Sequence, residues 1–543
     1  MSANVSVDKQ QVSEAERFSA LEQQVAVMAT ELERYKRERN EYKKLYELTL
    51  LELERTRRHL FGQKAERVDP DQLQMAFGPV AKALEQQDDK EDDETAPDQG
   101  SGDKSGKRRR RRTPHGRQKL SEHLAVERIE LPPAELDGDD ADQYERIGEE
   151  VSETLEWRTG SYVRVQVVRP KMVLKGDQEA GVFIAPPVEK PIDKGLAGPG
   201  LLSHVLVNKF CDHLPLHRLE KMFEREGIHV SRSTLCDWVM RCHELCHVVV
   251  DAMWQDALQN SSYVAVDATG VLVQQKVQCR KGHFWVLISE NEHVLFRYTT
   301  EHTKKAVEKV LGDYKGYVQA DAATVFDFLF NFKGCTEVGC WSHCRRRFFE
   351  AIATDQQRSL VAIGYIRKLY KIDREIQQLP AKKQTKERAA RAGPVVDAFY
   401  EWADSQALEV LPESPIGKAI TYARNQRKAL LQFLEDGRLR LDNNWSEREL
   451  RREAIGRRNW TFVGSDNGAV WNTTFVSLIA SCQLHGIEPW AYLRDILCLL
   501  PSWPKSRALD LSPKRWNETL KQPETQKLLD ANPFRKISMG RGS

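Results

Sequence analysis

The most informative segment of the sequence is LDNNWSERELRREAIGRRNWTFVGSDNGA, residues 441–469. It opens with Asp442, Asn443 and Asn444, which start a new helix, and Glu447 lies in the first turn of that helix. Upstream, residues 345–440 carry an almost unbroken helical pattern, and NWTFVGS downstream has the pattern of a strand. The block therefore predicts a glutamate-bearing helix that follows a long all-helical segment.

Before the helical segment, the apolar residues follow the period of strands. SYVAVDATGVLVQ (262–274), GHFWVLIS (282–289) and HVLFRYTT (293–300) predict three consecutive strands. A helix at 304–314 and two further strands, GYVQAD (316–321) and TEVGCW (336–341), follow. This order predicts an α+β or α/β sheet domain over 256–500, with a helical insertion at about 345–440.

Two of these strands end on an acidic residue. Asp267 closes SYVAVD and Asp321 closes GYVQAD, and a carboxylate at the end of a buried strand is better placed for a site than for stability. Together with Glu447, these oxygen ligands could bind two divalent cations for phosphodiester displacement. The alternative is that the aspartates open turns and that Glu447 favours the helix N-terminus.

Residues 197–247 carry three helical patterns, with Gly227 as a C′ glycine after the second and Ser231 as the N-cap of the third. This arrangement predicts a helix-turn-helix over 196–255 whose last helix exposes Arg232 and Ser233. An ordinary helical hairpin is the alternative interpretation.

The N-terminal region, 1–66, reads as a coiled coil, because one apolar seam repeats every seven residues with Arg39 as its polar interruption. The seam consists of Phe18, Val25, Leu32, Tyr46, Leu53 and Leu60. It favours a homo-oligomer, and a single amphipathic helix on the protein's own body is the alternative.

Residues 67–119 predict a disordered charged linker without apolar periodicity. Its acidic run, 85–98, precedes a basic block that consists of Arg108, Arg109, Arg110, Arg111 and Arg112. The net charge of +2 therefore conceals an acidic segment that is followed by a basic one. This separation of charge suggests a polyanionic partner. The block is either a clamp on the phosphate backbone of DNA or part of a solvated linker.

Residues 120–195 predict a small β module, in which VERIEL, GSYVRVQVVRPKMVL and GVFIAPPVEKPI are strand-like. Residues 501–543 read as a polar, proline-containing tail. No apolar stretch approaches the roughly 20 residues of a membrane span, and ten cysteines are too few for a disulfide scaffold, so we expect a cytoplasmic protein.

Two groups of cysteine and histidine residues could be zinc sites, although buried packing of the cysteines is the better interpretation. They are Cys335, Cys340, His343 and Cys344, and Cys242, His243, Cys246 and His247. Neither group has paired C-x-x-C spacing.

Taken together, these blocks resemble a bacterial DDE transposase of the insertion-sequence 66 family. Residues 441–469 are similar to the family's DNNxxER…L…GRKNWLFxGSxxG block, and GCWSHCRRRFFEA (339–351) is similar to its CWxHxRRxF segment. The helical stretch that begins LLSHVLVNKF at 201, and LFGQKAER at 60–67, resemble further family segments, so the likeness runs from about residue 40 to about 500.

The resemblance implies a ribonuclease-H-like catalytic domain whose catalytic and metal-binding residues are Asp267, Asp321 and Glu447. It also implies Mg²⁺ in a two-metal site, with Mn²⁺ as a substitute, and small accessory proteins from the same element. Family members usually carry four cysteines in the region that corresponds to 125–180, and this chain has none, so no zinc is expected in 120–195. Ala268 also replaces the glutamate that usually follows the first aspartate.

We therefore predict a DNA transposase that binds the element's ends and target as duplex DNA, cleaves a phosphodiester and transfers the strand. Arg345, Arg346, Arg451 and Arg452 are further candidates for phosphate contacts. The alternatives are a non-catalytic DNA-binding relative and a structure-specific metal-dependent nuclease.

Overall fold

The computed structural model describes residues 120–136, 141–158, 160–175, 181–276, 278–290, 292–321, 323–332 and 334–540. The predicted coiled coil, the predicted charged linker and the five arginines from Arg108 to Arg112 lie outside these residues. The described part belongs to one compact unit that begins at Arg109.

A three-stranded sheet forms the first module and consists of β1 (Ala125–Glu130), β2 (Tyr144–Arg158) and β3 (Ser161–Leu174), with short 3₁₀ turns at Ala134–Leu136 and Ala141–Gln143. The strand order is β1-β3-β2, where β1 is parallel and β2 antiparallel to β3. The prediction missed β2, because YERIGEEVSETLEWR is largely charged and mostly solvent-exposed, so it lacks an apolar alternation. The predicted strand at 181–192 is wrong, since only Phe183 forms a bridge, with Met172.

The larger sheet has five strands: β4 (Tyr263–Val273), β5 (Arg280–Ser289), β6 (His293–Thr299), β7 (Tyr317–Gln319) and β8 (Thr336–Val338). Their order is β6-β5-β4-β7-β8. The first three strands pair antiparallel, and β4, β7 and β8 pair parallel. Between β6 and β8 lie α6 (Lys304–Leu311), a 3₁₀ turn (Thr324–Phe326) and α7 (Asp327–Phe332). The sequence pattern placed all five strands, because buried strands are nearly continuous apolar runs.

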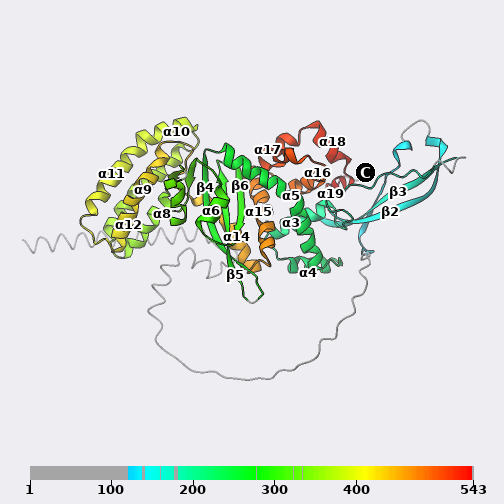
Figure 1. The fold of residues 1–543 in the computed structure, drawn as a ribbon, viewed down its shortest axis with the longest axis horizontal. Coiled ribbons are helices and arrows are strands. Elements are labelled where there is room, and N and C mark those ends of the chain that lie inside the picture. Colours follow the sequence, from blue (N-terminus) through cyan, green and yellow to red (C-terminus); the bar gives the residue numbers. More distant parts are fainter. Residues whose placement is uncertain are drawn as a thin grey trace, which may run out of the picture. The chain divides into compact units, whose positions relative to one another are not determined.

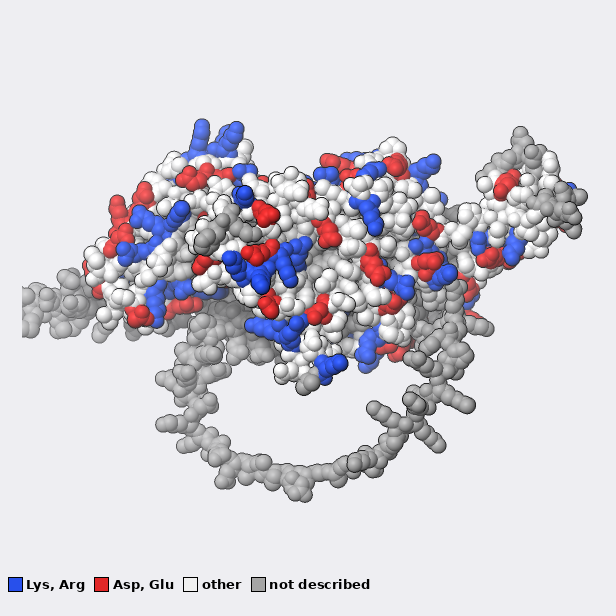
Figure 2. Space-filling model, in the orientation of Figure 1, with Lys and Arg blue, Asp and Glu red and all other residues white. Residues whose placement is uncertain are grey.

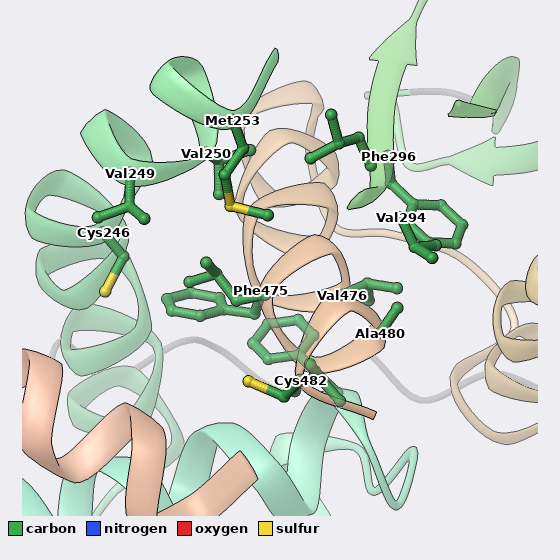
Figure 3. Close-up of a cluster of buried hydrophobic side chains, with 14 of the residues drawn as sticks. Cys246, Val249, Val250, Met253, Val294, Phe296, Phe475, Val476, Ala480 and Cys482 are labelled. Carbon is green, nitrogen blue, oxygen red and sulfur yellow. The ribbon is translucent and has the colours of Figure 1, made fainter. Parts of the chain in front are cut away.

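Three helices precede this sheet: α3 (Pro199–Phe210), α4 (Leu216–Arg225) and α5 (Arg232–Asn260). Gly227 has the positive φ, 68°, expected after α4, and the Ser231 hydroxyl accepts the Thr234 N–H at 3.2 Å, so both predicted helix-boundary residues are confirmed. Helix α5 packs against α15 (Asp466–Leu484) and β6 (Figure 1). Figure 3 shows the shared core, where Met253 of α5, Phe475 of α15 and Phe296 of β6 lie together.

The segment after β8 is helical, as predicted. It consists of α8 (Trp341–Glu350), a 3₁₀ turn (Ala351–Ala353), α9 (Gln356–Ile376), α10 (Ala381–Glu387), a π-helical turn (Arg388–Ala392), α11 (Gly393–Gln406), α12 (Pro415–Asn425), α13 (Arg427–Leu431) and a 3₁₀ turn (Gln432–Leu434). Figure 1 shows α8, α9, α11 and α12 side by side, and they enclose a core of their own around Trp341 and Phe399.

Helix α14 spans Asn444–Trp460, within the most informative segment of the sequence. The predicted strand at 459–465 is wrong: Trp460 still belongs to α14, and only Val463 bridges to β4, at Val273. A short apolar run can close a turn as readily as it forms a strand, because periodicity alone does not separate the two.

The predicted C-terminal tail is instead folded. It follows α16 (Pro489–Leu499) and contains a 3₁₀ stretch (Lys505–Leu511), α17 (Pro513–Thr519), α18 (Pro523–Ala531) and α19 (Pro533–Ser538). Phe534 and Ile537 of α19 pack on Val163, Val165 and Val167 of β3. The apolar residues are too widely spaced in the sequence to show a period, but they converge in the fold.

A buried carboxyl joins β2 to α3 and predicts a pH dependence of stability. Glu156 Oε1 accepts the N–H groups of Trp157 at 2.9 Å and Leu201 at 2.6 Å, so it caps α3. Burial raises the pKa of Glu156 from 4.5 to about 8, against the opposing effect of those N–H donors. The folded protein therefore holds this proton where the unfolded chain has lost it, and the free energy of unfolding falls as pH rises from about 4.5 to about 8.

Glu156→Gln should remove most of that dependence, because the amide keeps an acceptor oxygen without a titrating charge. Melting temperatures of both proteins at pH 6 and pH 8.5 check this prediction. If the melting temperature falls equally in both proteins between these pH values, groups other than Glu156 cause the pH dependence.

Candidate active site

Two aspartates lie beside each other where β7 ends. The parallel β4–β7 register pairs Tyr263 with Tyr317 and Ala265 with Gln319, and the same sequence interval separates Asp267 from Asp321. Asp267 is not at the end of its strand, as the sequence suggested, since β4 continues to Val273 in antiparallel pairing with β5. What ends there is the pairing of β4 with β7. Asp267 and Asp321 therefore occupy equivalent positions on the two segments, just beyond their last paired residues.

Glu447 reaches this region on α14, which packs on β4. The backbone before the helix is anchored at both sides: Asn443 donates its side-chain N–H to the Val266 carbonyl at 3.5 Å and its backbone N–H to Cys340 Sγ at 3.3 Å. Glu447 sits in the first turn, one residue after the buried Ser446. The helix start is therefore held next to the residue that precedes Asp267.

The three carboxylates interact electrostatically. Burial, and then the charges of Asp321 and Glu447, raise the pKa of Asp267 to about 7, although its carboxylate accepts the Ala268 N–H at 2.7 Å. Like charges that share a site disfavour ionisation of one of them, and a bound cation would relieve this repulsion. The three side chains therefore form one acidic group.

The donors fit a hard divalent cation. Carboxylate oxygens are the ligands that Mg²⁺ and Mn²⁺ prefer, and the buried Asn443 has a side-chain oxygen with no hydrogen-bond partner among the described residues. His343 Nε2 lies 3.5 Å from Glu447 Oε1 and can orient that carboxylate. The sequence pattern had suggested His343 only as a zinc ligand, since nothing in the sequence pairs it with Glu447.

The described residues contain one tighter group of potential ligand atoms, Asp256, Glu292 and His293, whose atoms all lie within 4.8 Å of one another. The carboxylates of Asp267, Asp321 and Glu447 are more widely spaced than that. A cation is already present in the tighter group, because Lys514 Nζ lies 2.7 Å from Glu292 and 3.4 Å from Asp256. His293 Nε2 is 2.9 Å from Asp256, so this group is a partly buried network of ion pairs and hydrogen bonds.

The two cysteine–histidine groups have other bonding partners. The Cys335 thiol donates to the Tyr314 carbonyl at 3.1 Å, and His243 Nδ1 lies 3.0 Å from the Thr474 hydroxyl. Burial raises the pKa of Cys340 to about 11 and raises that of Cys344 further, which disfavours the thiolate that zinc requires. These groups therefore favour the packing interpretation.

The side chains predicted to contact DNA differ in their exposure to solvent. Arg232, Ser233, Arg345, Arg346 and Arg451 are exposed on α5, α8 and α14. Figure 2 shows Lys and Arg side chains gathered over the region where Figure 1 places the larger sheet and α14.

Arg452 is less available than the prediction required, because its Nε donates to Glu449 at 2.7 Å and it also bonds Gln483. Glu449 is buried and Gln483 belongs to α15, so these bonds hold the Arg452 side chain against the protein.

These features define a class of protein: a mixed α/β protein with an acidic candidate site at its central parallel strands. Residues 194–470, just over half of the chain, match the family model described as "Transposase IS66 family". The chain therefore belongs to the IS66 family of transposases. Residues 50–129 match "Transposase C of IS166 homeodomain", and residues 477–513 match "IS66 C-terminal element".

Several curated relatives come from Sinorhizobium fredii (strain NBRC 101917 / NGR234). "Uncharacterized protein y4hP" is 28% identical over 494 residues, which covers 86% of this chain and 88% of that protein. "Uncharacterized protein y4qI" is 27% identical over 527 residues, which covers 93% of this chain and 95% of that protein.

None of the described helices has the length and hydropathy that a membrane crossing requires.

Proposed function

We propose that this chain is a DNA transposase that cleaves a phosphodiester at the ends of its own element and joins the freed strand to target DNA. The observation that supports the proposal is that the charges of Asp321 and Glu447 both act on the buried carboxylate of Asp267. The proposed catalytic domain is ribonuclease-H-like, with the helices of 341–434 inserted before the helix that carries Glu447.

In this proposal the three carboxylates hold two Mg²⁺ ions, for which Mn²⁺ can substitute. When bound, these ions supply an activated water and charge stabilisation on the attacking and leaving oxygens. The chain's own residues position the reactants: β4 and α14 set the spacing of the carboxylates, and His343 orients Glu447. Arg345, Arg346 and Arg451 contact phosphates beside the site, and Arg232 and Ser233 at the start of α5 contact base edges.

The test uses the full chain and a labelled duplex that carries the DNA flanking its reading frame. Mg²⁺ or Mn²⁺ should produce a cut at the element's end and a joined product, and Ca²⁺ should permit binding with little turnover. Binding without a cut in any metal would favour a non-catalytic DNA-binding protein. Cutting without end preference or joining would favour a structure-specific nuclease.

The proposed transposase also acts as an oligomer, held by the predicted coiled coil. Deletion of residues 1–66 should lower the molar mass measured by light scattering, because the heptad seam would be lost. Leu32→Asp in the full chain should act in the same direction, since a buried unpaired charge destabilises the seam. An unchanged mass in both variants would place the interface elsewhere.

A further inference from the structure

An open pocket of about 570 Å³ lies between the helix-turn-helix region and the end of the helix that carries Glu447. Its walls come from α3, α4 and α5 on one side and from the α14–α15 connection on the other. This volume is within the ~300–1,000 Å³ of small-molecule and cofactor sites. The proposed catalytic site does not use this pocket.

Aromatic side chains supply much of the pocket's surface. Trp460 closes α14, Phe462 follows it, and Trp471 lies on α15. Phe462 remains 41% exposed, which is unusual for a large apolar side chain, and both tryptophans are half-buried. Flat aromatic surfaces open to solvent are the groups on which nucleic-acid bases stack.

The charges on the pocket are of one sign. Lys209 and Arg232 line it, and no Asp or Glu is present among its described lining residues. Neither the Lys209 ammonium nor the Arg232 guanidinium forms a hydrogen bond or an ion pair with another described residue; Lys209 lies only over the Phe210 ring, at 5.1 Å. Glu453 acts on Lys209 from outside the lining and is itself held by Asn472 at 2.5 Å.

Burial lowers the pKa of Lys209, against the opposing effects of Cys236 and Glu453, and a further anion near its ammonium group would favour the charged form. An aromatic surface with an ammonium group beside it matches a ligand that combines a flat ring with a phosphate. Helix α14 connects this pocket to the acidic site: Trp460 lies about 20 Å along the helix from Glu447, at ~1.5 Å per residue. That is the length of about six nucleotides of a B-form strand.

We propose that this pocket binds an unpaired nucleotide of a DNA strand, with its base stacked on Trp471 and Phe462 and its phosphate contacted by Lys209. The inference rests on the proposed function, because a transposase would bring the DNA strand to this pocket. It adds a site that holds a base outside the double helix while the same strand reaches the carboxylates.

The test measures binding of two fluorescein-labelled single strands to the full chain in EDTA: a thymidine 12-mer and an abasic 12-mer with the same phosphates. Trp471→Ala should weaken binding of the thymidine strand about fivefold or more, because one stacking partner is lost. It should leave binding of the abasic strand unchanged. Lys209→Met should weaken binding of both strands.

Matched controls lie in the helical insertion. Trp402→Ala removes a half-buried tryptophan, and Lys382→Met removes an exposed lysine. Neither should change binding of either strand. Because Trp471 also contacts the core, Phe462→Ser provides a second variant at an exposed position, with the same expected loss for the thymidine strand alone.

Unchanged thymidine binding in Phe462→Ser, or equal losses on both strands in Trp471→Ala and Phe462→Ser, would overturn the proposal. The assay contains no divalent metal, so its result does not depend on cleavage. A chain that binds as expected but never cuts DNA would contradict the proposed function and leave this inference standing.

Discussion

Asp267→Asn is expected to lower Mg²⁺-dependent strand cleavage by about 10³-fold or more while DNA binding is retained. The substitution keeps the side chain's shape but removes one of the negative charges that would balance the cations, so catalytic charge stabilisation is lost. Asp321→Asn and Glu447→Gln should have effects of the same size. Cleavage of labelled duplex and a gel-shift assay measure the two properties separately.

The same variant should not be less stable without metal. Burial and two neighbouring negative charges act against the Asp267 carboxylate, and an amide avoids both effects. Its melting temperature in EDTA should therefore equal or exceed that of the original chain. A variant that loses cleavage together with several degrees of melting temperature would indicate a structural role instead.

The controls for this experiment must be chosen from the structure. Glu449 lies only two residues from Glu447 but is an unsuitable control, because it is buried and paired with Arg452. Asp397 and Glu401 are exposed on α11, so Asp397→Asn and Glu401→Gln are better controls. Both should cleave normally. Full cleavage by any of the three site variants would contradict the proposed mechanism.

Arg388→Met is expected to lower the free energy of unfolding by about 3–5 kcal/mol, because it breaks a buried charged network by removing one partner. Arg388 is 3% exposed, and its Nη1 donates to the carbonyls of Phe433, Asp436 and Leu439 at 2.8 to 3.0 Å. Its Nη2 donates to Asp373 at 2.7 Å. Methionine fills similar space but leaves three carbonyls and one carboxylate without this donor.

The affected loop leads directly into α14, so Arg388→Met should also increase hydrogen exchange over 433–443 and reduce cleavage indirectly. Urea denaturation and exchange mass spectrometry measure both effects. Arg391→Met is the matched control, since Arg391 pairs with Glu375 and Glu387 on the surface, where solvent screening leaves such pairs little effect on stability. Equal destabilisation by both variants would show that the carbonyl contacts of Arg388 are not decisive.

The fold could be predicted from the sequence where local patterns carry the information. Buried strands such as β4 and β5 are continuous apolar runs, and the boundaries of α4 and α5 follow from Gly227 and Ser231. Strand β2 could not be predicted, because most of its charged residues face solvent and its place depends on pairing with β3. The helices after Pro501 were not predicted for a related reason. Their apolar residues are scattered along the sequence, and Phe534 and Ile537 pack against β3, which lies far away in the sequence.

For the candidate site, sequence patterns were enough to select the residues: two aspartates after apolar runs and a glutamate in a first helical turn. The folded structure was needed to show that Asp267 lies within β4, that His343 contacts Glu447, and that Glu449 is buried. The pocket beside Trp471 likewise depends on α3, α5 and α15. Helix α15 follows the other two by more than 200 residues in the sequence. The physical reason is that propensity and hydrophobic period act over neighbouring residues, whereas burial, pairing and electrostatic coupling depend on segments that meet only in the folded chain.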